Sequence, residues 1–421
     1  MSSFIEVFKN AEARKVFQFP EFNRLLSARI LITLVIQIQN ISLYWMIYQL
    51  TKDPLSLGLI GLAEAIPSLA VVLYAGHLAD IYDRKKIVIY SFLLFSLSSL
   101  ALFFLSLYQG LSTDSFKIAV YSIVFISGIA RGFYRPANGA LLAQILPRSL
   151  YASGAAWSSS FWQIASVFGA SLGGILIGFI GMKFTFLFAF SLAVLGLIAL
   201  IGIKPKPSAI QQKADNLYYS LMMGVNFVFK NRIILGAMSL DLISVLFGGA
   251  VALLSVFASD VLKVGPELFG VLNAAPSVGA ILMSLFLAFR PPLANAGRNL
   301  IFAVIGFGFS MIFFALSTNF WLSVFFLVLS GVFDSVSVVI RSAIMQLLTP
   351  DEMRGRVSAV NTMFIGSSNE IGAFESGLAA RVMGLVPSVV FGGSMAVITG
   401  ITTFFANKKL KNLNLNKYFS E

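Results

Sequence analysis

The chain has 421 residues, of which 58% are hydrophobic and only 11% are charged, a composition that excludes a water-soluble domain of this length and indicates an integral membrane protein. The net charge of +12 is spread over short Lys and Arg tracts between apolar stretches, so we expect no nucleic-acid partner. With no Cys and one His, the sequence also excludes disulfides, thiol chemistry and an imidazole-rich metal centre, and we expect no metal and no cofactor.

The amino-terminal residues 1–20 contain basic residues but lack the apolar core of a signal peptide, so we expect the first span to be retained. Twelve apolar stretches then follow, each long enough to cross a bilayer as a helix. They lie near 24–50, 55–81, 86–108, 116–145, 150–180, 183–203, 233–260, 267–289, 299–316, 320–348, 354–383 and 386–406. The pattern predicts an all-α integral membrane protein with twelve transmembrane helices.

The most polar stretch of the chain divides the spans into two sets of six. We therefore expect a six-helix bundle over 1–203, a cytoplasmic linker over 204–232, a second bundle over 233–407 and a solvated cytoplasmic tail over 408–421. Within the linker, 217–229 is predicted to form an amphipathic surface helix. Lys and Arg are far more frequent on one side of the predicted membrane than on the other, where little lies beyond Lys52, Lys117, Lys183 and Lys263, which predicts that both termini are cytoplasmic.

The two predicted halves share sequence patterns at fixed spacing, which favours a duplicated fold. The fourth and tenth spans match in Ser127-Gly128 against Ser330-Gly331, with Arg131, Asn138 and Pro147 against Asp334, Arg341 and Pro350, and the second and eighth spans match in 61–68 against 270–277.

The segment from Gly76 to Lys86 resembles the signature loop between spans two and three of the major facilitator superfamily, and the resemblance covers nearly the whole chain. Arg131 is similar to the superfamily's second signature arginine. Gly169, Gly173, Gly174 and Gly178 resemble its antiporter motif, although Ala170 stands where that motif usually has proline. Segments 241–262, 270–280 and 349–361 resemble a bacterial group that contains the enterobactin exporter and related drug and siderophore efflux proteins.

This resemblance implies a two-bundle fold in the bacterial inner membrane, a functional monomer, alternating access and proton-driven export. We therefore predict a proton-coupled exporter, or antiporter, of an amphipathic small molecule such as a drug or siderophore. Uptake of a nutrient or metabolite, and a non-transporting receptor or scaffold, remain alternatives. An enzyme is not expected, because the sequence contains neither a nucleophile–base constellation nor a Gly-x4-Gly-Lys-Ser/Thr loop.

Charged residues at the end of the second span predict a gate. A carboxylate there can cap a neighbouring helix, and an arginine can pair with the other bundle, so that one side of the cavity is latched shut. The alternative is a loop anchored only by positive-inside charge. The candidate gating residues are Gly76, Asp80, Asp83 and Arg84.

Ionisable residues inside the spans predict an interior cavity, because a charge facing lipid is costly. Glu64 is the first candidate for proton coupling, since a carboxylate in apolar surroundings can take up and release a proton near neutral pH. Asp241, Asp334 and Glu370 are its rivals, and for each a structural hydrogen-bonding role is an equal alternative. We expect Arg131 and Asp334 to face each other across the cavity; the alternative is that they form a permanent structural ion pair.

Polar and aromatic residues at helical spacing complete the predicted cavity wall, although aromatic residues in spans more often serve packing. The substrate-cavity candidates are Gln37, Asn40, Tyr44, Arg131, Arg135, Asn138, Trp162, Gln163, Arg341 and Asn361.

Overall fold

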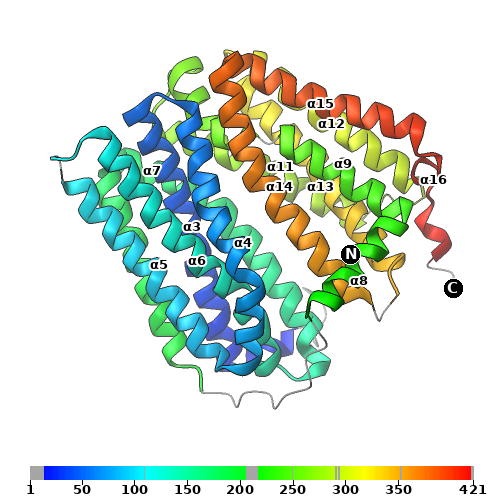
Figure 1. Cartoon of the computed structure of the whole chain (residues 1–421), viewed down its shortest axis with the longest axis horizontal. Coiled ribbons are helices and arrows are strands. Elements are labelled where there is room, and N and C mark those ends of the chain that lie inside the picture. The colour runs from blue at the N-terminus through cyan, green and yellow to red at the C-terminus, as the bar shows by residue number, and fades with distance from the viewer. Residues whose placement is uncertain are drawn as a thin grey trace. The chain divides into compact units, whose positions relative to one another are not determined.

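The structure, a computed structural model, describes residues 14–108, 110–204, 217–248, 250–289, 292, 294–350 and 353–418. Most of the polar part of the predicted linker, 205–216, lies outside these residues, as do the first 13 residues. The chain divides into two compact units, one of residues 1–212 with 264–274 and one of 213–263 with 275–421. Their helices are labelled in Figure 1.

The first unit is built from a short 3-10 helix and five long helices. They are η1 (Lys15–Gln18), α3 (Pro20–Thr51), α4 (Pro54–Ile81), α5 (Arg84–Leu107), α6 (Thr113–Ile145) and α7 (Arg148–Ile201). The 54 residues of α7 are two spans, because Gly181 has φ +80 and ψ 163, a backbone conformation that only glycine adopts readily. Gly181 therefore separates the fifth span from the sixth.

The second unit contains the remaining helices. They are α8 (Leu217–Lys230), α9 (Arg232–Gly248), η2 (Ala250–Leu253), α10 (Leu254–Val256), η3 (Phe257–Val261), α11 (Pro266–Phe289), α12 (Ala296–Leu316), α13 (Phe320–Leu347), α14 (Arg354–Met383), α15 (Leu385–Ala406), α16 (Lys408–Lys411) and η5 (Leu415–Tyr418). The first turns of α11 belong to the first unit.

The break between α14 and α15 repeats the break inside α7. Gly384 has φ +90 and ψ 162, and it follows Gly181 by 203 residues, the same offset that relates Gly128 to Gly331. Among the described glycines, Gly181 and Gly384 are the pair with positive φ. The repeat seen in the sequence therefore extends to the backbone conformation at corresponding turns of the two units.

The helix count agrees with twelve spans. Among the described residues, nine helices are long and apolar enough to cross a membrane, or ten if α8 and α9, which are bent by 99°, form one span. α7 counts once among the nine although it contains two spans, α9 has 17 residues, and α14 is more polar than the others. The chain is an all-α membrane protein with the twelve-helix fold. The span boundaries lie within a few residues of their predicted places, but the span predicted over 233–260 is interrupted: α9 ends at Gly248, and short 3-10, α and π segments continue to Val261.

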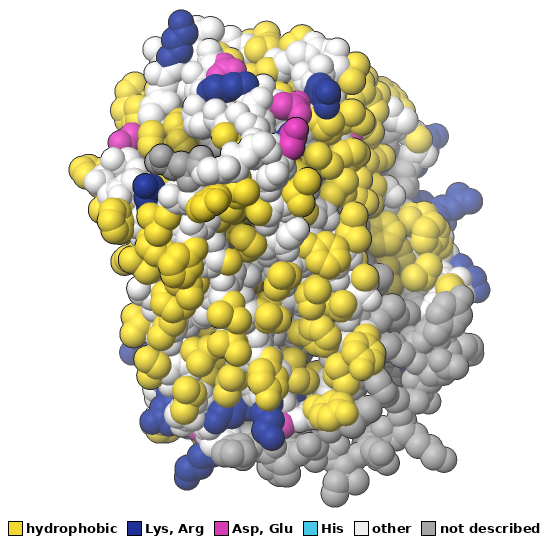
Figure 2. Space-filling model, turned by 60° about the vertical axis from the view of Figure 1, so that its left-hand side comes forward, with side chains coloured by type: hydrophobic (Ala, Val, Ile, Leu, Met, Phe, Trp, Pro, Cys, Tyr) yellow, Lys and Arg dark blue, Asp and Glu magenta, His cyan; other side chains and the backbone are white. Residues whose placement is uncertain are grey.

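The outward surface is that of a membrane protein. On the face in Figure 2, hydrophobic side chains cover the middle, and Lys, Arg, Asp and Glu gather at its two ends. Large apolar side chains such as Phe179 and Ile198 are 80% and 60% exposed, which water would penalise and lipid does not.

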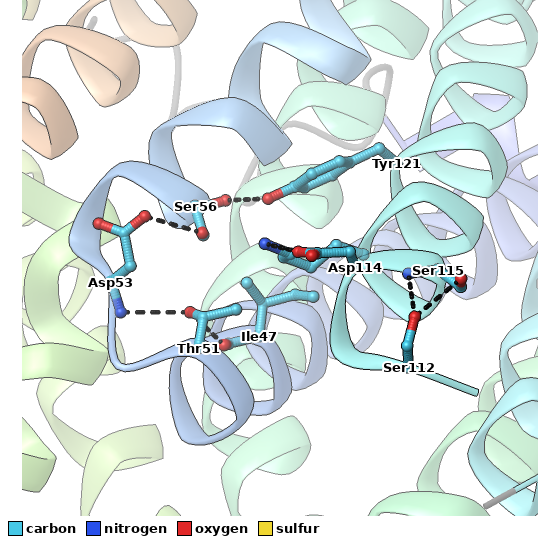
Figure 3. A network of polar contacts seen from close by, with 9 residues as sticks. Ile47, Thr51, Asp53, Ser56, Ser112, Asp114, Ser115 and Tyr121 are labelled. Carbon is cyan, nitrogen blue, oxygen red and sulfur yellow. Dashed lines mark hydrogen bonds and ion pairs between the residues drawn. The ribbon is translucent and has the colours of Figure 1, made fainter. Parts of the chain in front are cut away.

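A polar network holds one end of the first unit together (Figure 3). Asp53 accepts hydrogen bonds from the backbone N–H of Leu55 and from the Ser56 hydroxyl, and so caps α4. The Tyr121 hydroxyl on α6 donates to the Ser56 carbonyl at 3.1 Å. These bonds fix the register of α4 against α6, the two helices that carry Glu64 and Arg131.

The carboxyl-terminal segment differs from the sequence prediction. We expected a solvated tail, but Leu410, Leu413 and Leu415 are 0%, 6% and 0% exposed and pack with the core of the second unit. The lysines of α16 remain outside this core, with the Lys411 ammonium 3.7 Å from the centre of the Phe404 ring. The segment packs against the second unit because leucines are spaced among its lysines. The prediction of a solvated tail considered only the charge of the segment and overlooked these leucines.

Candidate functional site

A buried ion pair lies inside the first unit. The Glu64 carboxylate on α4 accepts from the Arg131 guanidinium on α6 at 2.5 Å, and the two side chains are 10% and 11% exposed. Both residues lie well inside predicted spans, where neither charge can be left alone at small cost. The two charges therefore compensate each other within one bundle.

Small residues bring the two helices close enough for this pair. A Cβ on Gly128 would collide with the Glu64 carbonyl and the Pro67 ring, and one on Gly132 would collide with Val71 and Ser68. Because α4 and α6 touch through their backbones at these points, the Arg131 side chain reaches Glu64 without crossing a layer of side chains.

Glu64 also lines a small pocket of about 10 Å³, on the order of one water molecule, whose wall is mostly apolar. Asn40, Gln39 and Ser127 share this pocket with apolar residues of α3, α5 and α6. Gln39 donates to the Ser99 hydroxyl at 2.5 Å, so polar groups of the pocket are tied to α5. The pocket is too small for a drug-sized molecule, but it places the polar side chains of Gln39, Asn40 and Ser127 beside Glu64.

The second unit has its own buried pair. Arg341 on α13 donates to the Asp241 carboxylate on α9 at 2.5 Å, with side chains 9% and 8% exposed, and its Nε donates to the Ser337 hydroxyl at 3.3 Å. Asp334 on α13 is half-buried and lies within electrostatic range of both Arg341 and Asp241. One arginine therefore serves two aspartates in this unit.

The contact that supports α13 repeats that of α6. Gly331 lies against the Pro276 carbonyl of α11, as Gly128 lies against Pro67, and the Ser284 and Ser335 hydroxyls hydrogen-bond at 2.8 Å nearby. The placement of Arg131 and Asp334 on either side of a shared cavity stays a prediction, because each is described here only within its own unit.

The predicted gating loop is folded onto its own unit. Asp83 caps α5 by accepting from the Lys85 N–H at 2.9 Å, and the Arg84 Nε donates to the Ala79 carbonyl at 2.8 Å. The Lys85 ammonium donates to the carbonyls of Ile201 and Ile203 at the end of α7. A Cβ on Gly76 would meet open space, so packing in this unit does not require glycine there.

The other predicted residues are dispersed. Gln37 touches the Gly169 position of α7, Asn40 lines the pocket beside Glu64, and Asn138 is buried. Tyr44 and Asn361 are partly buried. The exposed residues are Arg135, Trp162 and Gln163. The side chains of Asp80 and Glu370 lie outside the described set, so the gating and proton roles predicted for them stay predictions.

Sequence reasoning overlooked Arg29 in the first span. Its guanidinium donates to the Ser158 hydroxyl of α7 at 2.6 Å. The rule that singled out Arg131, an ionisable residue inside an apolar span, applies equally to Arg29. Gln39 was also missed, because it lies one residue off the helical stripe formed by Gln37, Asn40 and Tyr44.

Comparison with known proteins gives the family. The family model described as transmembrane secretion effector, a major facilitator type, matches residues 15–418. The chain belongs to this family of the major facilitator superfamily. It is therefore a multi-pass membrane transporter and not an enzyme.

Characterised relatives of the family are similar along most of their length. The multidrug efflux pump Tap of Mycolicibacterium fortuitum is 22% identical over 388 residues, which are 88% of this chain and 91% of Tap. The enterobactin exporter EntS of Shigella flexneri is 22% identical over 386 residues, 91% of this chain and 90% of EntS. Among solved structures, a D-xylose–proton symporter has a TM-score of 0.68 at 13% identity, with coverage of 94% and 98%, which shows the shared fold.

Proposed function

We propose that this transporter exports an amphipathic small molecule in exchange for protons by alternating access. The observation that carries the proposal is the buried Glu64–Arg131 pair beside a water-sized pocket. The names of Tap and EntS, an efflux pump and an exporter, support the direction.

The chemistry of the pair suits proton exchange. When Glu64 is ionised, its charge pairs with that of Arg131; when Glu64 takes up a proton, Arg131 loses this counter-charge inside the bundle. The cost of losing it favours either release of the proton or approach of another negative group. Binding of protons and cargo is thereby coupled through one arginine.

The gate and the orientation belong to the same proposal. Asp83, Arg84 and Lys85 hold the end of α4 and the start of α5 against the end of α7. In a cytoplasmic position, which the surplus of Lys and Arg on this side supports, this rigid corner would open and close as one piece during the transport cycle.

Inverted membrane vesicles test direction and coupling together. Vesicles containing the protein receive an imposed pH gradient, acid inside, and the accumulation of enterobactin and of ethidium is followed with and without an uncoupler. Export in the cell corresponds to accumulation inside these vesicles, and the proposal expects it for at least one probe only while the gradient is present. If the gradient instead drives preloaded probe out of the vesicles, the protein takes up its substrate in the cell. Accumulation that is unchanged by the uncoupler would contradict proton coupling.

A further inference from the structure

Arg29 is the feature of the first unit that the Glu64–Arg131 pair leaves unexplained. It is the tenth residue of α3, about 14 Å along the helix from Pro20. Its side chain is half-buried, and its guanidinium donates to Ser158, which is 4% exposed. A permanent cation thus lies at some depth in a span.

The surroundings of Arg29 contain no compensating charge among the described residues. The span arginines Arg131 and Arg341 each pair with a carboxylate at 2.5 Å, whereas the side chain that Arg29 contacts is the neutral Ser158 hydroxyl. A guanidinium has five N–H donors, so one bond to a hydroxyl leaves most of them to be satisfied. A charge in this setting favours an anion that arrives from outside the chain.

The Tyr134 hydroxyl is a second polar group in the first unit that lacks a hydrogen-bond partner among the described residues. Tyr134 on α6 is 8% exposed, and it lies within electrostatic range of Arg29. Its ring packs in an edge-to-face arrangement with that of Phe92, with ring centres 5.8 Å apart, so the phenol is held in place. Buried hydroxyls without partners are rare and point to a ligand or a water.

The three groups together offer donors. Arg29 can only donate, Tyr134 has an unused O–H, and Ser158 accepts from Arg29 and so keeps its own O–H for a further bond. Such a set repels metal ions and ammonium groups. It fits an oxyanion, which only accepts, and charge-assisted hydrogen bonds are the strong ones.

We propose that Arg29, Ser158 and Tyr134 form a subsite for the carboxylate or similar oxyanion of the transported molecule. The proposal rests on the proposed function and narrows its cargo to amphipathic anions. A neutral analogue of the cargo would lack the charged group that this subsite binds, and we expect it to bind more weakly than the anion beside α3, α6 and α7.

A binding measurement tests this subsite without requiring transport. The purified protein is placed in nanodiscs of zwitterionic phosphatidylcholine, and radiolabelled benzoate is titrated by scintillation proximity, with benzamide as the uncharged competitor of the same shape. We expect saturable benzoate binding that benzamide does not displace. Because the assay reports binding alone, a failure of export in vesicles would leave this result intact, and the two proposals can fail separately.

Variants of the three residues supply the controls. Arg29→Gln should weaken benzoate binding by about 10-fold or more, as expected when a hydrogen-bonded charge is lost, while Arg29→Lys should retain most of it. Tyr134→Phe, which keeps the ring packing and tests the site if Arg29→Gln fails to fold, should weaken binding about 3-fold or more. The matched control is Arg24→Gln on the same helix, whose side chain donates to the Gly202 carbonyl and which should bind as wild type does.

Three results would overturn the proposal. The first is a lack of saturable benzoate binding to the wild type, the second is competition by benzamide as strong as that by unlabelled benzoate, and the third is unchanged benzoate binding in the Arg29→Gln and Tyr134→Phe variants. Phosphatidylglycerol in the nanodiscs separates a lipid headgroup from cargo: displacement of benzoate by this lipid in the wild type, and not in Arg29→Gln, would assign the site to a headgroup and contradict the role in cargo binding.

Discussion

The two units pack their corresponding helices in the same way but distribute charge differently. Gly128 lies against the second span of its unit, and Gly331 lies against the eighth at the matching position. Gly181 and Gly384 break their helices with nearly the same backbone angles. The small residues that shape the backbone are thus repeated in both units.

The charged residues are not repeated. Position 131 is arginine where position 334 is aspartate, and position 64 is glutamate where position 273 is asparagine. One pair joins α4 to α6, and the other joins α9 to α13. A charge that the fold required would be expected in both units, so we expect the charges to serve transport and the glycines to serve architecture.

The largest effect expected from this comparison is on transport. Asp334→Asn keeps the size of the side chain and leaves Arg341 its carboxylate partner Asp241. The variant should fold but lose transport, as seen by a wild-type elution profile and unfolding temperature together with no accumulation in inverted vesicles. Full transport activity would show that Asp334 has no part in the mechanism.

Removal of one partner of a buried pair should cost the most stability. Asp241→Ala removes the carboxylate that accepts from Arg341 and leaves Asp334 as the remaining carboxylate within electrostatic range, which is expected to destabilise the protein by about 3 kcal/mol. Loss of helical circular dichroism on heating in detergent measures this. The neutral triple variant Asp241→Asn, Asp334→Asn and Arg341→Gln should recover most of the loss, and a triple variant no better than Asp241→Ala would mean that packing, not charge, is responsible.

The glycine contact gives a smaller effect. Gly128→Ala places a Cβ against the Glu64 carbonyl, and this overpacking should cost about 1–3 kcal/mol. Gly139→Ala on the same helix is the matched control, since its Cβ meets open space, and it should be neutral or stabilising by up to about 1 kcal/mol. Equal thermal shifts in the two variants would remove the argument for close approach of α4 and α6.

The smallest effect concerns the hydrogen bond from the Tyr121 hydroxyl to the Ser56 carbonyl, drawn in Figure 3. Tyr121→Phe removes the donor to the Ser56 carbonyl and should cost about 0.5–1.5 kcal/mol. Ser122→Ala, whose hydroxyl bonds only within α6 at the exposed surface, provides the comparison and should change stability by less than about 0.5 kcal/mol. A larger loss in Ser122→Ala would show that the network at this end of the unit does not fix the register.

The sequence predicted the spans well because length and hydrophobicity determine them. Each predicted boundary lies within a few residues of a helix end, and even 217–229 is close to α8 at Leu217–Lys230. The tail was predicted wrongly, because three leucines spaced among lysines carry little weight in a composition average. Side-chain burial there depends on the surface of α12 and α9, which a linear pattern does not contain.

The interior charges could be predicted, but their partners could not. Glu64 and Arg131 were recognised as buried ionisable residues from their place in apolar spans. The two residues can meet because the backbones of α4 and α6 approach each other closely at Gly128. The sequence does not predict this contact, since a glycine occurs in a span for several other reasons. Arg29 could have been found from the sequence alone, as an arginine inside an apolar span. Its electrostatic interaction with Tyr134 could be found only from the structure.

In the proposed mechanism, the Glu64 carboxylate couples protons to cargo, and its charge is not needed for folding. Glu64→Gln retains an oxygen that can accept from Arg131 but cannot ionise. Vesicles with the variant and with the wild type should be compared for gradient-driven accumulation of a transported probe and for exchange of that probe at equal pH on both sides. We expect the variant to keep exchange and to lose accumulation; a variant that still concentrates the probe against its gradient would contradict the assignment of Glu64.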